Sequence, residues 1–288
     1  PDVTASTDVD RTDTDEPDAP GRTRREYCYN ILVSGLDDDN GGSDTNILVR
    51  FDVPNKRIDL VSLPRDTLLH NEYRNNKLNF AYAKGGTELL MEQIENLLGI
   101  PVDFYVTVNL KGFIALVDQI DGVDFDIPIN MDYDDPYQDL HIHFTKGPRH
   151  LNGQEAMEVV RFRHNNDGTG YGTEDIGRIG TQQAFLKAVA KQLLQIGNVK
   201  NIPALVDIFY TYVKTDLTTG NLVWLGNEAL NIGTENIHFA TLPGDGSGYY
   251  NKQSVYVRDA QATCDLVNEA LNPYNEALTL EDMDILVP

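Results

Sequence analysis

The amino-acid sequence predicts an α/β fold in which a mixed central sheet is sandwiched by helices in a single domain. Short apolar runs of strand character alternate with longer runs of helical period, and no clean boundary separates them. The chain has 288 residues, of which 41% are hydrophobic, so it is long enough to bury a full core.

Order is expected to begin at residue 27. Residues 1–26 are rich in Asp, Thr and Pro without an apolar period, which predicts a disordered acidic linker ahead of a domain at 27–288. No run approaches the roughly 18 apolar residues of a membrane span. Because the chain begins with Pro1 rather than Met, we expect that a signal peptide or anchor helix was removed.

Three strands are predicted to open the domain as a meander, at 28–34, 46–51 and 57–63. Pro64 cannot donate a hydrogen bond to a sheet, so the third strand should end before it.

The rest of the domain mixes helices and strands. Apolar stripes and caps predict helices at 88–98 with Thr87 as N-cap, from 110 to near 122, at 153–160 with Asn152 as cap, and at 181–195, 203–213, 220–231 and 258–271. Further strands are predicted at 103–108, 123–128 and 237–242.

The net charge of −22 argues against non-specific binding of nucleic acid, which requires a basic face. An anionic ligand would therefore need a local cluster of arginines. The two cysteines, Cys28 and Cys264, have no metal-binding spacing, and they either pair in one disulfide or remain as buried thiols. The His141-x-His143 pair lacks an obvious third ligand. We interpret all six histidines as structural: His70, His141, His143, His150, His164 and His238.

Two carboxylates are expected at neighbouring strand ends. Asp37 follows the first predicted strand and Asp44 starts the second. Such a pair can share Mg²⁺, which prefers oxygen ligands. The alternative is a solvated acidic loop.

Two groups of basic residues could face an anion. Arg65 and Asp66 follow the strand that ends at Pro64, although most such pairs are surface charges. Arg161 and Arg163 would point the same way if the chain is extended there, whereas a basic helix end is the alternative.

A third group follows a glycine-rich loop from Asp167 to Gly177. The loop is expected to deliver Arg178 and Gln182 to the start of a helix, where they could bind phosphate oxygens. A glycine-rich linker without a ligand is the alternative. Together, two carboxylates and four arginines describe a site for a metal-bound pyrophosphate.

These motifs resemble the LytR-CpsA-Psr (LCP) family. The resemblance covers residues 30–195, with 196–288 as the C-terminal completion of the same domain. The matching segments are Ile31–Asp37, Ser43–Thr45, Ser62–Thr67, Lys77–Gly86, Gly112-Phe113, Asp121–Val123, Leu151–Ala156, Arg161–Arg163, Asp175-x-Gly177-Arg178 and Gln182-Gln183.

The resemblance implies an extracytoplasmic, membrane-anchored phosphotransferase of the bacterial envelope. Such proteins move an anionic glycopolymer, a teichoic acid or capsular polysaccharide, from a polyprenyl-pyrophosphate carrier to peptidoglycan. Carried over by residue, Asp37 and Asp44 would hold Mg²⁺. Arg65, Arg161 and Arg163 would contact the pyrophosphate, with Arg178 and Gln182 completing the site. Asp66 would orient the neighbouring arginines by ion pairing or act as a base, and orientation is favoured.

The sequence departs from the family pattern at two positions. Gly42 and Thr181 stand where the family commonly has arginine. The departures keep two alternatives open, a non-catalytic binder of polyprenyl phosphate or wall polymer, and a pyrophosphatase that acts on the lipid carrier.

Overall fold

The computed structural model describes residues 21–36, 41–137, 139–171, 174–195 and 210–286. The described chain forms two compact units. Unit 1 contains the described residues up to Asn109 and from Val213 onward, and unit 2 contains those from Leu110 to Tyr212.

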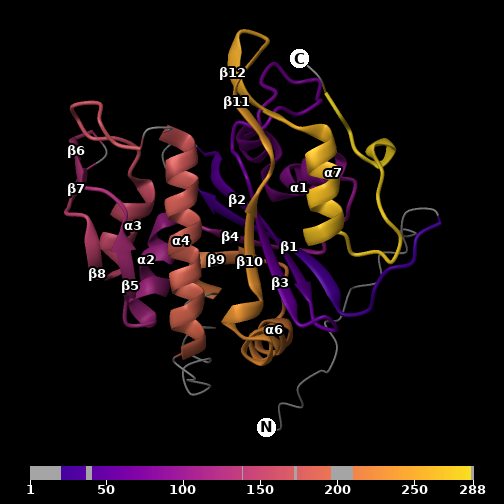
Figure 1. The fold of residues 1–288 in the computed structure, drawn as a ribbon, viewed down its shortest axis with the longest axis horizontal. Coiled ribbons are helices and arrows are strands. Elements are labelled where there is room, and N and C mark those ends of the chain that lie inside the picture. Colours follow the sequence, from indigo (N-terminus) through magenta and orange to yellow (C-terminus); the bar gives the residue numbers. More distant parts are fainter. Residues whose placement is uncertain (1–20, 37–40, 138, 172–173, 196–209, 287–288) are drawn as a thin grey trace. The chain divides into compact units, whose positions relative to one another are not determined.

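Unit 1 is built on a six-stranded sheet with the strand order β10-β3-β2-β1-β4-β9 (Figure 1). The first three strands form the predicted antiparallel meander. Parallel pairing of β1 with β4 and of β3 with β10 makes the sheet mixed, as predicted. The strands are β1 Cys28–Leu36, β2 Ser43–Asp52, β3 Arg57–Leu63, β4 Phe104–Val108, β9 Val213–Thr215 and β10 Ile237–Thr241.

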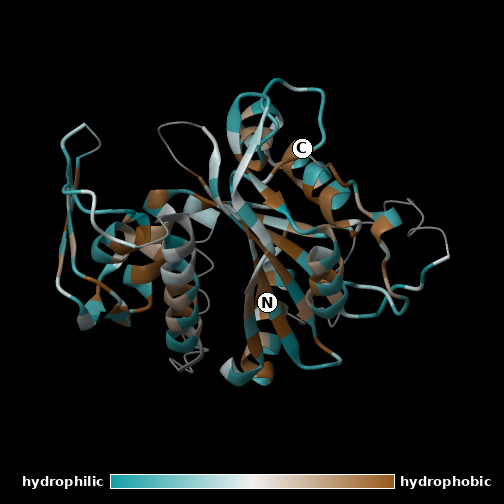
Figure 2. Cartoon of the chain, turned by 45° about the horizontal axis from the view of Figure 1, so that its top comes forward, coloured by the Kyte–Doolittle hydropathy of each residue, from teal (hydrophilic) through white to brown (hydrophobic). Residues whose placement is uncertain are grey.

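Helices cover both faces of this sheet. On one face, residues such as Leu48 pack with α1 (Leu78–Leu98) and α7 (Ala260–Ala270). On the other face, residues such as Phe51 pack against α6 (Thr219–Ile232). Hydrophobic colouring accordingly concentrates on the strands of the sheet (Figure 2). The predicted sandwich is therefore confirmed within unit 1.

Helix α1 starts at Leu78 rather than at the predicted Glu88. Its backbone is non-helical at Gly86, where φ is 69°, so that the helix is kinked immediately before Thr87. The expected cap residue therefore follows a kink within α1. The predicted end is confirmed, because Gly99 adopts the left-handed conformation of a C-cap.

Residues 21–26 contact the core of unit 1. Arg22 forms an ion pair with Asp282 at 2.6 Å, and Arg24 forms one with the buried carboxylate of Asp103. Residues 1–20 of the predicted linker lie outside the described residues, and ordered contacts thus begin before Tyr27.

The sequence analysis missed a hairpin formed by β11 (Gly244–Tyr250) and β12 (Gln253–Arg258). Its two connecting residues, Asn251 and Lys252, both have positive φ, as a type I′ turn requires. Because the second turn residue is Lys rather than Gly, the usual Asn-Gly signal is absent. The described residues of unit 1 also form the short 3-10 helices η2 Thr234–Asn236 and η3 Leu280–Asp282.

In the described part of unit 2, three helices and two two-stranded sheets pack around an apolar core. The capping box at Asn152 confirms the predicted helix start. Strands β6, β7 and β8 were not predicted. The elements are α2 Leu110–Gln119, β5 Val123–Ile127, β6 Met131–Asp135, β7 Leu140–Phe144, β8 Gly147–Leu151, α3 Gly153–Arg161 and α4 Glu174–Gln195.

The structure also bears on the helix predicted at 203–213, on the two cysteines and on membrane spans. Most of the helix predicted at 203–213 lies outside the described residues, and Val213 begins β9 rather than ending a helix. Cys28 and Cys264 are unpaired and buried, which agrees with the thiol alternative. Among the described residues, no helix combines the length and the apolar character that a membrane crossing requires.

Candidate functional site

The first cluster of predicted site residues lies at one edge of the sheet in unit 1. The pairings Leu36↔Ser43 and Asn46↔Leu63 bring the end of β1, the start of β2 and the end of β3 to this edge. Arg65, just beyond β3, donates from Nη1 to Asp44 Oδ1 at 2.8 Å. Their side chains are 24% and 39% exposed. The strand ends thus present a cation and a carboxylate to solvent.

Backbone hydrogen bonds hold the Pro64–Thr67 turn in place. Thr67 donates from its amide and its hydroxyl to Pro64 O at 3.0 and 2.6 Å. Asn79, at the start of α1, donates to Arg65 O, and Tyr256 of β12 donates to Asp66 O. Contacts from α1 and β12 therefore fix the backbone on which Arg65 and Asp66 are mounted.

Asp66 pairs with a residue that the sequence analysis did not assign to the site. Its carboxylate forms an ion pair with Lys77 Nζ at 3.1 Å. Lys77 precedes α1 and is 20% exposed, so it adds a second cation beside the turn. Lys77 appeared in the motif Lys77–Gly86, but without a role.

Oxygen ligands at this edge fit the preferences of Mg²⁺. Asp44 contributes a carboxylate, and the adjacent Ser43 hydroxyl is fully buried without a hydrogen-bond partner among the described residues. An oxygen atom in that state can accept a cation. Asp37, the other predicted ligand, lies outside the described residues.

The Arg161-Phe162-Arg163 segment lies in unit 2 and is not extended throughout. Arg161 is the last residue of α3, which agrees with the alternative of a basic helix end. Phe162 leaves the helix with φ −58° and ψ 134°, and its side chain is only 1% exposed. The burial of Phe162 anchors the segment between the partly buried Arg161 and the exposed Arg163.

Arg178 and Gln182 lie within a helix rather than at its start. Because α4 begins at Glu174 instead of Thr181, both residues occupy its N-terminal half, four positions apart on one face. Arg178 is buried, at 8% exposure. Gln182 donates to Val160 O at 3.1 Å and so ties α4 to α3.

Hydrogen bonds close a turn in the described first part of the preceding glycine-rich segment. Asn165 donates to Thr169 O at 2.7 Å, and Gly168 donates to Asn165 O at 3.0 Å. Gly168, with φ 80°, and Gly170, with φ 151°, supply left-handed backbone that these turns require. Residues 165–170 thus form a turn, and Gly172 and Thr173 lie outside the described residues.

Tyr171 covers the beginning of α4 and was missed by the sequence analysis. Its hydroxyl lies 2.7 Å from the hydroxyl of Thr181, and burial raises the pKa of the phenol. Thr181 also donates to Gly177 O at 3.1 Å. A side chain at Gly177 would approach the Tyr171 ring to 2.4 Å. The Thr181 hydroxyl therefore links Tyr171 to the backbone of α4.

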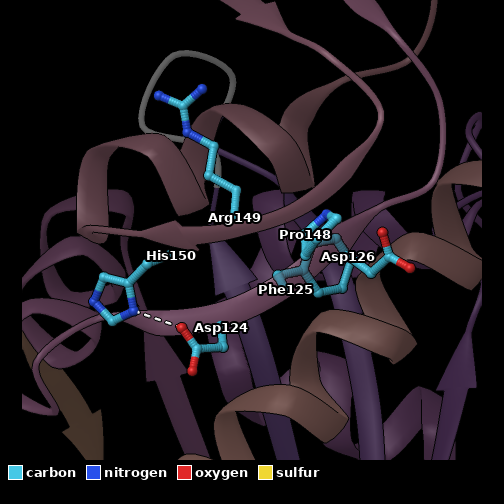
Figure 3. A pocket seen from close by; sticks show the side chains of 6 residues that line it. All are labelled: Asp124, Phe125, Asp126, Pro148, Arg149 and His150. Carbon is cyan, nitrogen blue, oxygen red and sulfur yellow. Dashed lines mark hydrogen bonds and ion pairs between the residues drawn. The ribbon is translucent and has the colours of Figure 1, made fainter.

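A pocket of about 470 Å³ lies elsewhere in unit 2, along β5 and β8 (Figure 3). Its walls include Asp124, Phe125 and His150, and His150 pairs with Asp124 at 2.8 Å. None of the predicted site residues lines it.

The match to known proteins extends over nearly all of the chain. The model of the LytR_cpsA_psr family matches residues 3–272. The chain belongs to the LytR_cpsA_psr family. The resemblance at 30–195, and its continuation beyond 195, are thereby confirmed.

Two curated relatives are teichoic acid transferases by name. TagV of Bacillus subtilis, a polyisoprenyl-teichoic acid–peptidoglycan teichoic acid transferase, is 34% identical over 66% of this chain and 50% of its own length. TagU of Bacillus cereus, which has the same description, is 32% identical over 83% of this chain and 76% of its own. The chain therefore spans about half the length of TagV.

The crystal structure of B. subtilis TagV is similar to this fold. It superposes with a TM-score of 0.71 at 28% sequence identity, and the match covers 83% of this chain and 94% of the TagV chain. The αβα architecture predicted from the sequence is thus that of the family.

Proposed function

We propose that this protein transfers an anionic glycopolymer from a polyprenyl-pyrophosphate carrier to peptidoglycan at the cell envelope. The observation that carries the proposal is the Asp44–Arg65 pair at 2.8 Å, in which Arg65 lies on a turn that contacts from α1 and β12 fix. Its support is membership of a family in which TagV and TagU are named as teichoic acid transferases. A fixed guanidinium at the solvent-exposed end of a strand is suited to phosphate oxygens.

In the proposed reaction, a hydroxyl oxygen of the peptidoglycan acceptor attacks the phosphorus that carries the polymer. The bond from that phosphorus to the bridging oxygen breaks, polyprenyl phosphate leaves with the electron pair, and the hydroxyl proton passes to solvent water. Arg65 would stabilise negative charge on the diphosphate. Asp66 is assigned to positioning, because its carboxylate pairs with Lys77.

Asp44 and the Ser43 hydroxyl are the described groups that we propose as ligands of Mg²⁺, with Asp37 as a further ligand from the sequence. When bound, Mg²⁺ would neutralise charge on the diphosphate. On the family resemblance, we also propose Arg161, Arg163, Arg178 and Gln182 of unit 2 as ligands of pyrophosphate. The contact of Gln182 with Val160 also gives it a structural role.

The test supplies a polyprenyl-diphosphate-linked glycopolymer with and without peptidoglycan fragments. If the protein is a transferase, polyprenyl phosphate and the glycopolymer–peptidoglycan conjugate should form together. Neither product should form when the peptidoglycan fragments are omitted. Release of phosphate products without acceptor would indicate a pyrophosphatase, and donor binding without turnover would indicate a carrier-binding protein. Removing Mg²⁺ with EDTA and then restoring it tests whether turnover depends on Mg²⁺.

Arg65→Ala should lower turnover about 10²- to 10³-fold, the usual cost of removing one donor to developing charge. The matched control is Arg74→Ala, an exposed arginine in the segment before α1, which should retain turnover. If Arg65 and Arg163 serve one donor, the double variant should lose less than the summed free energies of the single variants. Normal turnover by Arg65→Ala would overturn the assignment.

A further inference from the structure

The β6–β7 hairpin of unit 2 carries two histidines and two aspartates on one face. The register pairs Asp132 with His143 and Asp134 with His141. Because alternate residues of a strand share a face, all four side chains project from the same side of the hairpin. All four are exposed, with side-chain exposures between 46% and 82%.

The opposite face of the hairpin is anchored in the core. Met131, Leu140, Ile142 and Phe144 are all buried, at 1%, 5%, 0% and 6% exposure. Packing of these side chains in the core therefore fixes the position of the hairpin that carries the histidines.

The outer edge of β6 is also fixed. Asn165 Oδ1 accepts from the Asp132 amide and Asn166 Oδ1 from the Asp134 amide, each at 2.7 Å. The Asn166 amide in turn donates to Asp132 O at 3.1 Å. These contacts orient the backbone beneath two of the four polar side chains, which lowers the entropic cost of binding a ligand there.

Three ligand-type atoms converge on this face. One atom each from Asp134, His141 and His143 lies within 4.8 Å of the other two. Asp134 Oδ1 is 2.5 Å from His141 Nδ1 and 3.4 Å from His143 Nε2. Ligands on a tetrahedral Zn²⁺ lie about 3.3 Å apart, given metal–ligand bonds of about 2.0–2.2 Å. Small side-chain rotations would therefore bring all three into coordination.

The ring nitrogen of each histidine that faces away from Asp134 lies near another carboxylate, as is usual for histidines that bind metals. His143 Nδ1 donates to Asp132 at 2.8 Å, which leaves Nε2 directed toward Asp134. His141 Nε2 lies 3.7 Å from Asp139, while its Nδ1 faces Asp134. A carboxylate on the second nitrogen orients the ring and raises its basicity as a ligand.

We propose that Asp134, His141 and His143 form a binding site for a divalent transition-metal cation, of which Zn²⁺ is the best fit. Two imidazoles and one carboxylate suit Zn²⁺ or Cu²⁺ better than Mg²⁺, which prefers oxygen ligands. Three protein ligands leave one position of a tetrahedral ion for water or for an anionic group. The site is separate from the Mg²⁺ ligands proposed in unit 1.

Isothermal titration of the untagged full chain with Zn²⁺ alone tests the proposal. We expect one Zn²⁺ per chain, at least tenfold weaker binding in His141→Ala and in His143→Ala, and about tenfold weaker binding in Asp132→Asn. Mg²⁺ at the same concentration should not compete. Co²⁺ bound in place of Zn²⁺ should give the visible absorption of a tetrahedral site, which an unspecific surface ion does not give.

The matched control is His150→Ala. His150 is an exposed histidine whose Nδ1 lies 2.8 Å from Asp124, its cross-strand partner, so it repeats the His–Asp pair without a second histidine. It should bind Zn²⁺ as the parent does. Absence of a one-to-one complex, or equal weakening by His150→Ala and His143→Ala, would overturn the proposal, and far-UV circular dichroism checks that each variant is folded.

Discussion

Arg50 and Asp59 form a buried ion pair across β2 and β3, and removing either partner should have unequal effects. The Arg50 Nη2–Asp59 Oδ2 distance is 2.7 Å, and the side chains are 4% and 3% exposed. Asp59 has a second partner, since Arg57 donates three hydrogen bonds of 2.7–2.9 Å to it. Arg50, in contrast, donates its side-chain hydrogen bond to Asp59, with no second carboxylate partner among the described residues.

Asp59→Leu leaves the guanidinium of Arg50 buried without its carboxylate, which should cost about 3–5 kcal/mol of unfolding free energy. Arg50→Met leaves Asp59 paired with Arg57, so the loss should be nearer to that of one charge-assisted hydrogen bond, about 1.5–3 kcal/mol. In the double variant both charges are replaced by apolar groups, and the loss should be smaller than for Asp59→Leu alone.

Urea unfolding followed by tryptophan fluorescence measures these differences within unit 1. The chain contains a single tryptophan, Trp224 on α6. It packs against Tyr29 of β1, in the sheet that also contains β2 and β3. Arg57→Ala is the control, because Arg57 is 32% exposed and its pair should contribute about 1 kcal/mol or less. The reasoning is refuted if Arg50→Met costs as much as Asp59→Leu, or if the double variant shows the full sum of both losses.

Two further predictions concern other parts of the chain. Burial, reinforced by the charge of Asp52, raises the pKa of the Cys28 thiol to about 11. Since the thiolate is the reactive form, roughly one thiol in a thousand is ionised at pH 8, and Ellman's reagent should react with Cys28 only after unfolding. Rapid reaction of the native protein would contradict this. Asn152→Ala removes the capping box of α3 and should lower the unfolding free energy by about 0.5–2 kcal/mol, measured by thermal circular dichroism, whereas an unchanged midpoint would show that the cap contributes nothing.

The sequence predicted best where one local signal decides the structure. The strand at 57–63 was predicted residue for residue, because Pro64 and the turn at 54–56 delimit it. The start of α3 at Gly153 was also predicted correctly, because Asn152 is a recognisable N-cap residue. Helix α1 was predicted too short, because its kink at Gly86 resembles a helix start when only the sequence is considered.

The candidate site could be anticipated only in part. The position of Arg65 at a strand end was predictable, but its contact with Asp44 depends on which strands are neighbours. Lys77 and Tyr171 were missed, since each acts through a residue distant in the sequence. The donation from the Gln182 side-chain amide to Val160 O was also not predictable, because it depends on how α4 packs against α3.

The sequence by itself determined the αβα class and the family motifs. These depend on composition and on patterns within short windows. Only the tertiary structure decided which side chains meet. For the histidine pair at 141 and 143, the missing third ligand is Asp134, which lies on the neighbouring strand. Strand pairing and its register are long-range properties, which a periodicity read along one segment does not contain.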